Sequence, residues 1–353
     1  MKKMSSLLAA MALTFTLAMP VLAHDGWSQT NTPIVAPGEV SYVELLLGNH
    51  SNHHGSYRIE GKWSTQTSKV FVSAPNGSKT DISATLFYTG EEKEVAEPGK
   101  NNYYVASFSS SSPGAYIVSV EGDSIFKHGD VASRTLRSAK SFVAVSDIPT
   151  VERVKYLKWF SKQVSPDRAE MVPLFNPAAA TPGQDVSVQL LLKGKPLADT
   201  EITIVRRSTS ESQVLKTDGN GIISFQTGPA DYYLLRAKPT TDEKVAGQYD
   251  TTNYEATMTF TVQNGKSVFP QKAQQALPLL YVNGKHMMVK GMEIKNGKVM
   301  VPASFIQSAL DSSFKGTGSV ELRATTEKLG ASVEYFAQVG SLPPAILINK
   351  GQK

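Results

Sequence analysis

From residue 40 to residue 264 the sequence repeats one pattern, in which short runs of β-branched and aromatic residues alternate with clusters of Gly, Pro, Asn and Ser. Such runs, with partial alternation of apolar and polar residues, predict strands joined by turns. The first group of runs is VSYVELLLG (40–48), KVFVSAP (69–75), ISATLFYTG (82–90), YYVASF (103–108), AYIVSVEG (115–122) and KSFVAVSD (140–147). Strands of this length and spacing are typical of an antiparallel sandwich, which we expect over residues 24–148.

A second group of β-patterned runs follows a connector, which we predict over residues 149–170. Within it, VERVKYLKWFSKQVSPD has apolar residues at helical spacing and predicts a short helix or an irregular connector. The later runs are DVSVQLLLKGKPLADTEITIVRR (185–207), KTDGNGIISFQT (216–227), ADYYLLRAKP (230–239) and NYEATMTFTVQN (253–264). They predict a second immunoglobulin-like sandwich over residues 171–264.

The last part of the chain differs from the first two. We predict a linker over residues 265–278 and a separate unit over residues 279–353. LYVNGKHMMV and IKNGKVMVP each contain an NGK turn between apolar runs, which indicates two hairpins. VPASFIQSALDSS predicts a helix and Thr325 to Leu329 a second helical turn. The expected fold class is therefore mainly β, with two antiparallel immunoglobulin-like β-sandwiches followed by a small α+β module.

The N-terminus resembles a secretory signal peptide. A basic start, MKKM, precedes the apolar run LLAAMALTFTLAMPVLA, which ends in small residues typical of a cleavage site. Because Thr and Pro interrupt the apolar run, we predict that residues 1–23 are removed rather than retained as a membrane span. Cleavage after Ala23 would start the mature chain at HDGWSQ and place it in the periplasm or outside the cell, with no transmembrane segment.

Composition excludes several kinds of site. The chain has no cysteine, which excludes disulfides, thiolate metal sites and cysteine nucleophiles. The formal charge of +5 falls to +3 once Lys2 and Lys3 are removed, too little and too scattered to indicate nucleic-acid binding. The sequence contains no GxSxG, HExxH or phosphate-loop motif. We therefore expect a protein that is not an enzyme.

Histidines concentrate near the predicted mature N-terminus. Neutral imidazole is a ligand for nickel, copper, cobalt and zinc, so a cluster of histidines in a cysteine-free chain indicates a metal site. Glycines on both sides of GNHSNHHG favour a loop. The candidate metal ligands are His24, His50, His53 and His54. The alternatives are a frayed terminus for His24 and a solvated turn for the loop. The remaining histidines, His128 and His286, are interpreted as a surface and a structural residue.

The terminal position of His24 adds a chelate. An α-amino group has a lower pKa than a lysine amine and can give up its proton to a metal near neutral pH. Together with the His24 imidazole it closes a chelate ring, and one or two loop imidazoles would complete a square-planar or distorted site suited to Ni(II) or Cu(II). Because His53 and His54 are adjacent, we do not expect both to point into one site. The hypothesis requires cleavage between Ala23 and His24.

Four stretches resemble the secreted two-sandwich family that includes NikK, the periplasmic nickel-binding component of energy-coupling-factor nickel transporters. They are AHDGW, LLLGNHSNHHG, MVPLFNPAAATPGQDVSVQLLLKGKPLADTEITI, and DGNGIISF with YEATMTFTV, and they lie within residues 23–263. The resemblance implies capture of Ni(II) or Co(II) outside the membrane and delivery to a permease and ATPase complex. It places His24 at the terminal ligand and His50 at the loop ligand, whereas His53 and His54 match a loop richer in histidine than the family pattern.

Residues 279–349 resemble a different unit, the N-terminal stalk domain of copper amine oxidases. YVNGKHMMVKGMEIKNGKVMVPASFIQSAL and KLGASVEY carry this resemblance, and DSSFKGTGSVELRAT interrupts it. The resemblance implies a small module for display or partner contact, without catalysis and without a copper site.

Three other functions compete with nickel delivery. A copper-dependent polysaccharide monooxygenase also uses an N-terminal histidine on a β-sandwich, and a periplasmic copper carrier shares the same terminus. An envelope adhesion or scaffold protein would carry the histidines incidentally. The preferred hypothesis is an extracytoplasmic carrier of Ni(II), with Co(II) or Cu(II) as the alternative ions.

Overall fold

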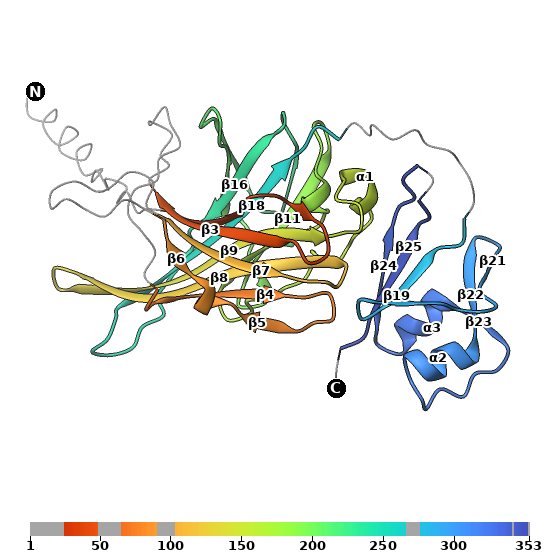
Figure 1. The fold of residues 1–353 in the computed structure, drawn as a ribbon. Helices are drawn as coiled ribbons and strands as arrows, with labels where there is room; N and C mark the ends of the chain where they lie inside the picture. The colour runs from red at the N-terminus through yellow and green to blue at the C-terminus, as the bar shows by residue number, and fades with distance from the viewer. Residues whose placement is uncertain (1–24, 49–64, 90–102, 266–275, 341, 352–353) are drawn as a thin grey trace, which may run out of the picture.

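The computed structural model describes residues 25–48, 65–89, 103–265, 276–340 and 342–351. In these ranges the protein is mainly β, as predicted, with antiparallel sheets and only short helices (Figure 1). No helix in the described ranges is both long and apolar enough to cross a membrane.

The first sheet has four strands in the order β1-β3-β7-β6. Along β3, inward Val43 and Leu45 are buried whereas Val40 and Tyr42 are exposed, the alternation expected of a strand with one face on a core. Val43 and Leu45 pack in one cluster with Val118 of the opposing sheet. The strand bounds are β1 (Asp25–Thr30), β3 (Val40–Gly48), β6 (Phe87–Tyr88) and β7 (Tyr103–Ser109).

The second sheet has ten strands and runs through both predicted sandwiches. Eight strands follow the order β14-β13-β16-β18-β9-β8-β4-β5, while β17 pairs with β18 and β2 pairs with β9. The bounds are β2 (Ile34–Val35), β4 (Ser68–Ser73), β5 (Lys79–Asp81), β8 (Gly114–His128), β9 (Val131–Val145), β13 (Glu201–Arg206), β14 (Ser212–Lys216), β16 (Asp231–Ala237), β17 (Thr240–Thr241) and β18 (Thr251–Val262).

The two halves of this sheet join through a parallel pair. Strands β9 and β18 pair in register from Ser133 opposite Thr251 to Lys140 opposite Met258. A parallel pair requires a long crossover connection, which here is the whole second β unit. The two predicted sandwiches are therefore not separate layers joined only by a connector, because they share one sheet (Figure 1).

The third sheet closes the second β unit. In the described residues it contains β10 (Ala169–Pro173), β11 (Asp185–Leu192), β12 (Lys195–Pro196) and β15 (Ile222–Gln226). Val188 and Leu190 of β11 pack against Ile202 and Leu235 of the ten-stranded sheet in the largest core cluster. The predicted DGNG turn precedes β15, and Asp218 Oδ1 accepts hydrogen bonds from Asn220 N at 2.9 Å and Ile222 N at 2.8 Å.

The run ISATLFYTG is only partly a strand, contrary to prediction. A 3-10 turn, η1 (Ser83–Thr85), replaces its first half, and among the described residues of the run only Phe87 and Tyr88 form a strand, β6. Ser83 Oγ accepts a hydrogen bond from Val70 N at 2.9 Å, and Ser83 N donates to Asp81 Oδ1 at 2.8 Å. Such local side-chain bonds offer the backbone an alternative to a ladder, which the apolar pattern does not reveal.

The connector contains a single turn of helix, α1 (Val151–Val154), with Thr150 accepting a hydrogen bond from Arg153 N at its start. The predicted helical spacing extends to Leu157 and Phe160, which are buried at 2% and 0% exposure, but the chain reaches them through turns. The prediction of a short helix within an irregular connector is thus confirmed, and the apolar residues at helical spacing are buried beyond the end of the helix.

The C-terminal module has two small sheets, β20-β19-β25-β24 and β21-β22-β23. Both NGK turns form as predicted, with positive φ at Asn283 and Gly284 and at Asn296 and Gly297, as a type I′ hairpin requires. Both predicted helices are present as well. The bounds are β19 (Leu279–Val282), β20 (Lys285–Met287), β21 (Glu293–Lys295), β22 (Lys298–Pro302), α2 (Ala303–Ala309), β23 (Ser319–Glu321), α3 (Leu322–Lys328), β24 (Ser332–Phe336) and β25 (Ala345–Asn349).

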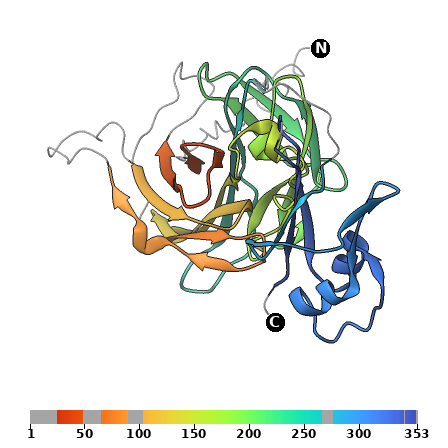
Figure 2. The same ribbon diagram turned by 45° about the vertical axis from the view of Figure 1, so that its right-hand side comes forward.

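The module packs against the connector rather than hanging free of it. Phe336 and Leu347 belong to the same core cluster as Leu157 and Phe160. Figures 1 and 2 show β24 and β25 between the connector and the two helices of the module. Two charged side chains, Arg153 and Glu334, make hydrogen bonds across the same interface.

Candidate functional site

The four candidate metal ligands, His24, His50, His53 and His54, lie outside the described residues. Within the part of the chain that the structure describes, no group of three or more His, Asp or Glu side chains is arranged to hold a metal ion. The described residues do establish where the two segments that carry these histidines attach to the fold.

The two attachment points are neighbours. Strand β1 pairs antiparallel with β3, and the register places Asp25 opposite Gly48 at one end of the ladder. Residue 24 precedes Asp25 and residue 49 follows Gly48, so the predicted N-terminal histidine and the predicted histidine loop join the fold at adjacent positions. Residues opposite each other in an antiparallel pair have Cα atoms about 4.5–5.5 Å apart.

Strand β1 is buried along its whole length. All six residues have little exposure, and Trp27 has none. Trp27 packs in a cluster with Leu46 of β3 and with Val205 and Leu234 of the second β unit. Trp27 therefore serves the packing of this end of the fold. Because β1 is covered on both faces, its first residue, Asp25, is held far more firmly than a residue in a frayed segment would be.

Hydrogen bonds fix β1 across β18. Gly26 O accepts from Thr257 Oγ1 at 2.8 Å, and Gly26 N donates to Glu255 Oε1 at 2.7 Å. Further along, Ser28 O accepts from Thr259 Oγ1 at 2.5 Å. The main chain of β1 is thus attached by side chains of the second β unit, although the strand itself pairs with the first.

Asp25 is the most constrained charged group at this end. Its side chain has no solvent exposure, and its carboxylate forms ion pairs with Arg236 and with Lys238, the latter at 2.5 Å. The neighbouring carboxylate of Glu255 pairs with Arg137 at 2.6 Å. Buried charge is tolerated only when it is paired, so this cluster ties the first residues of β1 to β16 and β9.

Sequence reasoning did not find the role of Asp25. The only local signal is the alternation in LLRAKP, which places Arg236 and Lys238 on one face of a predicted strand. Nothing local indicates that Asp25, 211 residues from Arg236, is their partner. We name Asp25, Arg236, Lys238, Glu255 and Arg137 the N-terminal clasp.

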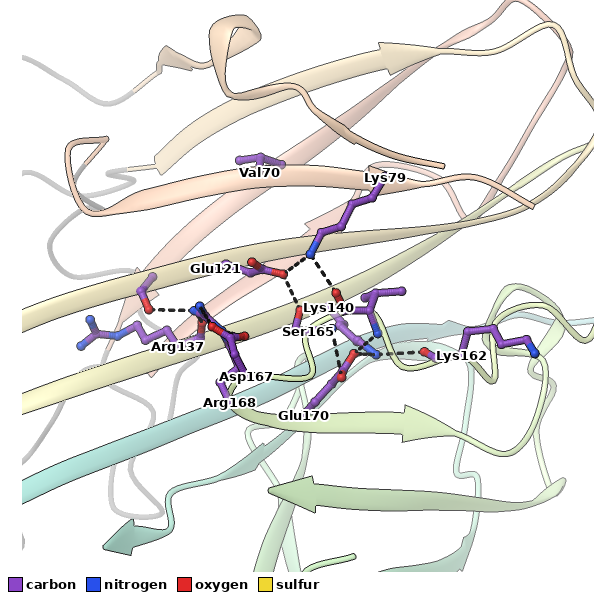
Figure 3. Close-up of polar contacts among 12 residues, drawn as sticks. Val70, Lys79, Glu121, Arg137, Lys140, Lys162, Ser165, Asp167, Arg168 and Glu170 are labelled. Atoms are coloured by element: carbon purple, nitrogen blue, oxygen red, sulfur yellow. Dashed lines mark hydrogen bonds and ion pairs between the residues drawn. The ribbon is translucent and has the colours of Figure 1, made fainter. Parts of the chain in front are cut away.

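A second network of buried charge holds the connector on the ten-stranded sheet (Figure 3). Lys140 of β9 forms an ion pair with Glu170 of β10, and neither side chain is exposed. Glu170 also accepts hydrogen bonds from Val164 N at 2.7 Å and Ser165 N at 3.1 Å. Burial lowers the pKa of the Lys140 ammonium, and the opposing charge of Glu170 partly offsets that effect.

The other contacts of this network are also made within the protein. Glu121 Oε1 accepts from Lys79 Nζ at 2.6 Å and from Ser165 Oγ at 2.6 Å. Arg168 donates to the carbonyl oxygens of Gly122 at 3.0 Å and Arg137 at 2.9 Å (Figure 3). Because these donors and acceptors are directed at the protein itself, the arrangement suits attachment of the connector rather than chemistry on a substrate.

The connector is tied to the C-terminal module by two further charged groups. Arg153 donates to the carbonyl oxygens of Ala337 and Pro343, at 2.5 and 2.7 Å, and pairs with Asp147 at 2.7 Å. Glu334 accepts from Lys158 N at 2.6 Å and Trp159 N at 2.5 Å. Burial raises the pKa of Glu334, while the two backbone donors act in the opposite direction.

His286 lies in β20, opposite Tyr281 of β19, with the two ring centroids 5.3 Å apart. Its side chain is exposed, so its interpretation as a structural residue rests on the contact with Tyr281 alone. The backbone of His128 ends β8 at the tip of the long β8–β9 hairpin.

Solved structures share little more than β architecture with this chain. A DUF4785 family protein from Legionella pneumophila matches at 11% identity and a TM-score of 0.20, over 59% of this chain and 49% of its own. The chain thus spans about half the length of that protein. Two fibronectin type-III domains of chicken tenascin match at 10% identity and a TM-score of 0.16, covering 66% and 98%. The Yersinia pseudotuberculosis adhesin InvE matches at 12% identity and 0.17, covering 91% and 92%.

No curated protein matches the chain significantly. One family model does, and it spans residues 21–241, which is more than half of the chain. The match includes β1, β3 and the segments in which the candidate histidines occur. The chain therefore belongs to the family described as a domain of unknown function, DUF4198.

Proposed function

We propose that this protein is an extracytoplasmic carrier that captures Ni(II) or Co(II) through its processed N-terminal histidine and loop histidines and delivers the ion to a membrane transporter. The observation that carries the proposal is the register of β1 and β3, which joins residue 24 and the segment after residue 48 to the fold at neighbouring positions. The motifs that resemble the NikK-like family lie within the matched segment or just beyond it.

The N-terminal clasp gives the proposal a physical basis. A chelate of amine and imidazole binds best when its backbone is already held in place, because less conformational entropy is lost on binding. Asp25, which would follow the metal-binding residue, is fully buried and ion-paired. In this proposal the second β unit supplies the rigidity, and the first supplies the ligands.

The transported ion is cargo, so it must be released as well as bound. The ladder of β1 and β3 ends at Asp25 opposite Gly48, so the proposed ligands belong to the segments that follow these ends and not to the buried strand itself. In this proposal a transporter takes the ion by offering competing ligands. Delivery to a permease and ATPase complex is the partner assignment that the family resemblance implies.

The decisive experiment begins with the mass of the secreted protein. Cleavage after Ala23 predicts a mature chain that starts at His24. That material is then titrated with Ni(II), Co(II) and Cu(II) and followed by visible absorption. We expect binding that is weakened by several kcal/mol in His24→Ala and in a chain with one extra residue ahead of His24, since both lose the chelate.

The matched control is His286→Ala, which removes an imidazole from the C-terminal module and should bind metal as the unmodified protein does. If His24→Ala and His286→Ala behave alike, or if the secreted chain starts elsewhere, the proposal is wrong. Binding of Cu(II) alone, with oxygen consumption in the presence of a reductant and chitin or cellulose, would instead favour the copper-enzyme alternative.

A further inference from the structure

A cavity lies where the C-terminal module meets the first β unit, and none of its lining residues is a candidate histidine. Its volume is about 300 Å³. One wall comes from the β4–β5 and β7–β8 turns, and the other from the NGK turn at Asn283 and the end of β25 at Asn349. Small-molecule sites commonly have volumes of about 300–1,000 Å³, so this cavity fits a ligand of one or two rings.

The walls are held in place by contacts that any ligand would find preformed. Tyr116 Oη donates to Ser112 O at 2.7 Å and is also hydrogen-bonded to Ser110 Oγ at 2.7 Å. Across the cavity, Gly284 packs so closely on Ser112 that an added Cβ would lie 2.1 Å from its Oγ. The module and the β unit therefore meet in a fixed way around this space.

The lining combines apolar side chains with uncharged polar groups and carries no formal charge. Three carboxamides, from Asn76, Asn283 and Asn349, line it together with several hydroxyl groups. Asn76 Oδ1 accepts from Ser78 N at 3.0 Å, and Asn283 Oδ1 accepts from Lys350 N at 2.9 Å. An Asn whose oxygen is engaged presents its two N–H donors to an incoming acceptor.

Asn349 supplies the observation that points to a ligand. The residue is only 6% exposed, and its Nδ2 atom is buried with no hydrogen-bond partner among the described residues. A buried donor without a partner costs about 1–3 kcal/mol. An acceptor oxygen on a molecule in the cavity, or a water in its absence, would remove that cost.

Aromatic side chains complete the lining. Phe108 and Tyr116 both border the cavity, with ring centroids 5.9 Å apart, beside the aliphatic side chains of Val72 and Ile82. Amide donors, hydroxyl groups and aromatic surface without charge match the chemistry of a neutral sugar, which offers many hydroxyl oxygens and apolar C–H faces. Anionic or cationic ligands would find no opposite charge in this lining.

We propose that this cavity binds a neutral saccharide unit of one or two rings, and so attaches the protein to glycan outside the cytoplasm. The proposal is independent of metal binding. The ligand hydroxyls accept from the Asn carboxamides and its apolar face packs on the aromatic surface. Because the two walls belong to different units, an occupied cavity also strengthens the contact between them.

The test is a titration of the purified protein with glucose, maltose, N-acetylglucosamine and chitobiose, followed by calorimetry and by the side-chain amide NMR signals of the asparagines. We expect at least one sugar to bind with a dissociation constant on the order of 1 mM, as for a small neutral ligand, and to shift the signals of Asn283 and Asn349.

Two variants decide where any sugar binds. Ser109→Trp fills the cavity from an exposed position, and Asn349→Leu removes the buried amide at similar volume. Each should weaken binding at least tenfold, whereas Ser107→Trp, on the same strand but outside the cavity, should not. Thermal unfolding checks that each variant is folded, and Ser109→Trp decides alone if Asn349→Leu is not.

Three results would overturn the proposal. The first is that no sugar of the panel binds. The second is binding that Ser109→Trp leaves unchanged, because the sugar then occupies another surface. The third is displacement of the sugar by inorganic phosphate, because an uncharged lining should not bind a dianion in place of a neutral sugar.

Discussion

The ammonium of Lys140 meets the carboxylate of Glu170 in the interior, and neither side chain is exposed to solvent. Lys140 lies on β9 of the ten-stranded sheet, and Glu170 begins the next unit on β10. The pair therefore joins the first β unit to the chain that leaves the connector. Breaking a buried pair leaves one uncompensated charge, which is costlier than removing both.

Lys140→Met should lower the free energy of unfolding by about 3–5 kcal/mol, because it leaves the Glu170 carboxylate buried without its cation. The double variant Lys140→Met/Glu170→Gln should recover a large part of this loss. Its amide oxygen can still accept from one of the two backbone donors, Val164 N or Ser165 N, which bond different carboxylate oxygens of Glu170. Urea unfolding measures both. A double variant no more stable than Lys140→Met would show that the charge is not the cause.

Glu334→Gln should change how stability depends on pH. Burial raises the pKa of Glu334 above 4.5, so the folded state holds this proton more tightly than the unfolded state. Its contribution to stability is fully present below about pH 4.5 and is lost as the pH rises through the folded-state pKa. The free energy of unfolding of the variant, relative to that of the unmodified protein, should therefore be higher at about pH 7 than at about pH 4. Urea unfolding at both values tests this, and an equal difference at both would contradict it.

Asp25→Asn should loosen the N-terminal clasp. It keeps the shape of the side chain but removes the charge that Arg236 and Lys238 face. A hydrogen bond to a charged group contributes about 1.5–3 kcal/mol, and we expect a loss of that size in unfolding experiments. Asp199→Asn is the matched control, because its pair with Lys216 is largely exposed and should contribute less than about 1 kcal/mol.

The same variant separates the anchor from the ligands in the proposed function. If β1 positions the terminal chelate, Asp25→Asn should weaken Ni(II) binding under conditions where the protein remains folded. Asp199→Asn should leave Ni(II) binding unchanged. Equal metal affinity in all three proteins would show that the clasp has no part in holding the metal site.

Metal binding should weaken steeply as the pH falls below about 8, since the terminal amine and the imidazoles must lose protons before they bind. Ni(II) titrations between about pH 5 and pH 8 test this and should show proton release on binding. Binding that does not change over this range would point to carboxylate ligands instead. The His286→Ala variant should show the same pH profile as the unmodified protein.

Gly284→Ala should disturb the contact between the C-terminal module and the first β unit. The added Cβ would lie 2.1 Å from Ser112 Oγ, at a φ of +80°. Gly297→Ala is the control, because that glycine has a φ of +72° in the same kind of turn but nothing within 4 Å of an added Cβ. Backbone strain should destabilise both variants by about 1–3 kcal/mol. Any additional loss of stability in Gly284→Ala therefore measures the contact with Ser112. Thermal unfolding measures it, and equal losses would exclude a tight contact.

Local sequence pattern determined most of the strands and turns. VSYVELLLG became β3 with its predicted bounds, and both NGK segments became hairpin turns with positive φ at Asn and Gly. These features depend on residues next to each other in the chain, whose sterics and alternation act regardless of the rest of the fold. The candidate histidines were also found from local pattern, and as metal ligands they stay predictions.

Only the tertiary structure determined which strands lie side by side in each sheet and which charged side chains form ion pairs. The parallel pair of β9 and β18, the Lys140–Glu170 ion pair and the attachment of Asp25 to Arg236 all join segments that are distant in sequence. Alternation of apolar residues specifies that a strand has a buried face but not which strand lies beside it. That choice depends on how whole sheets pack and on which buried charges find partners, and both are properties of the assembled core.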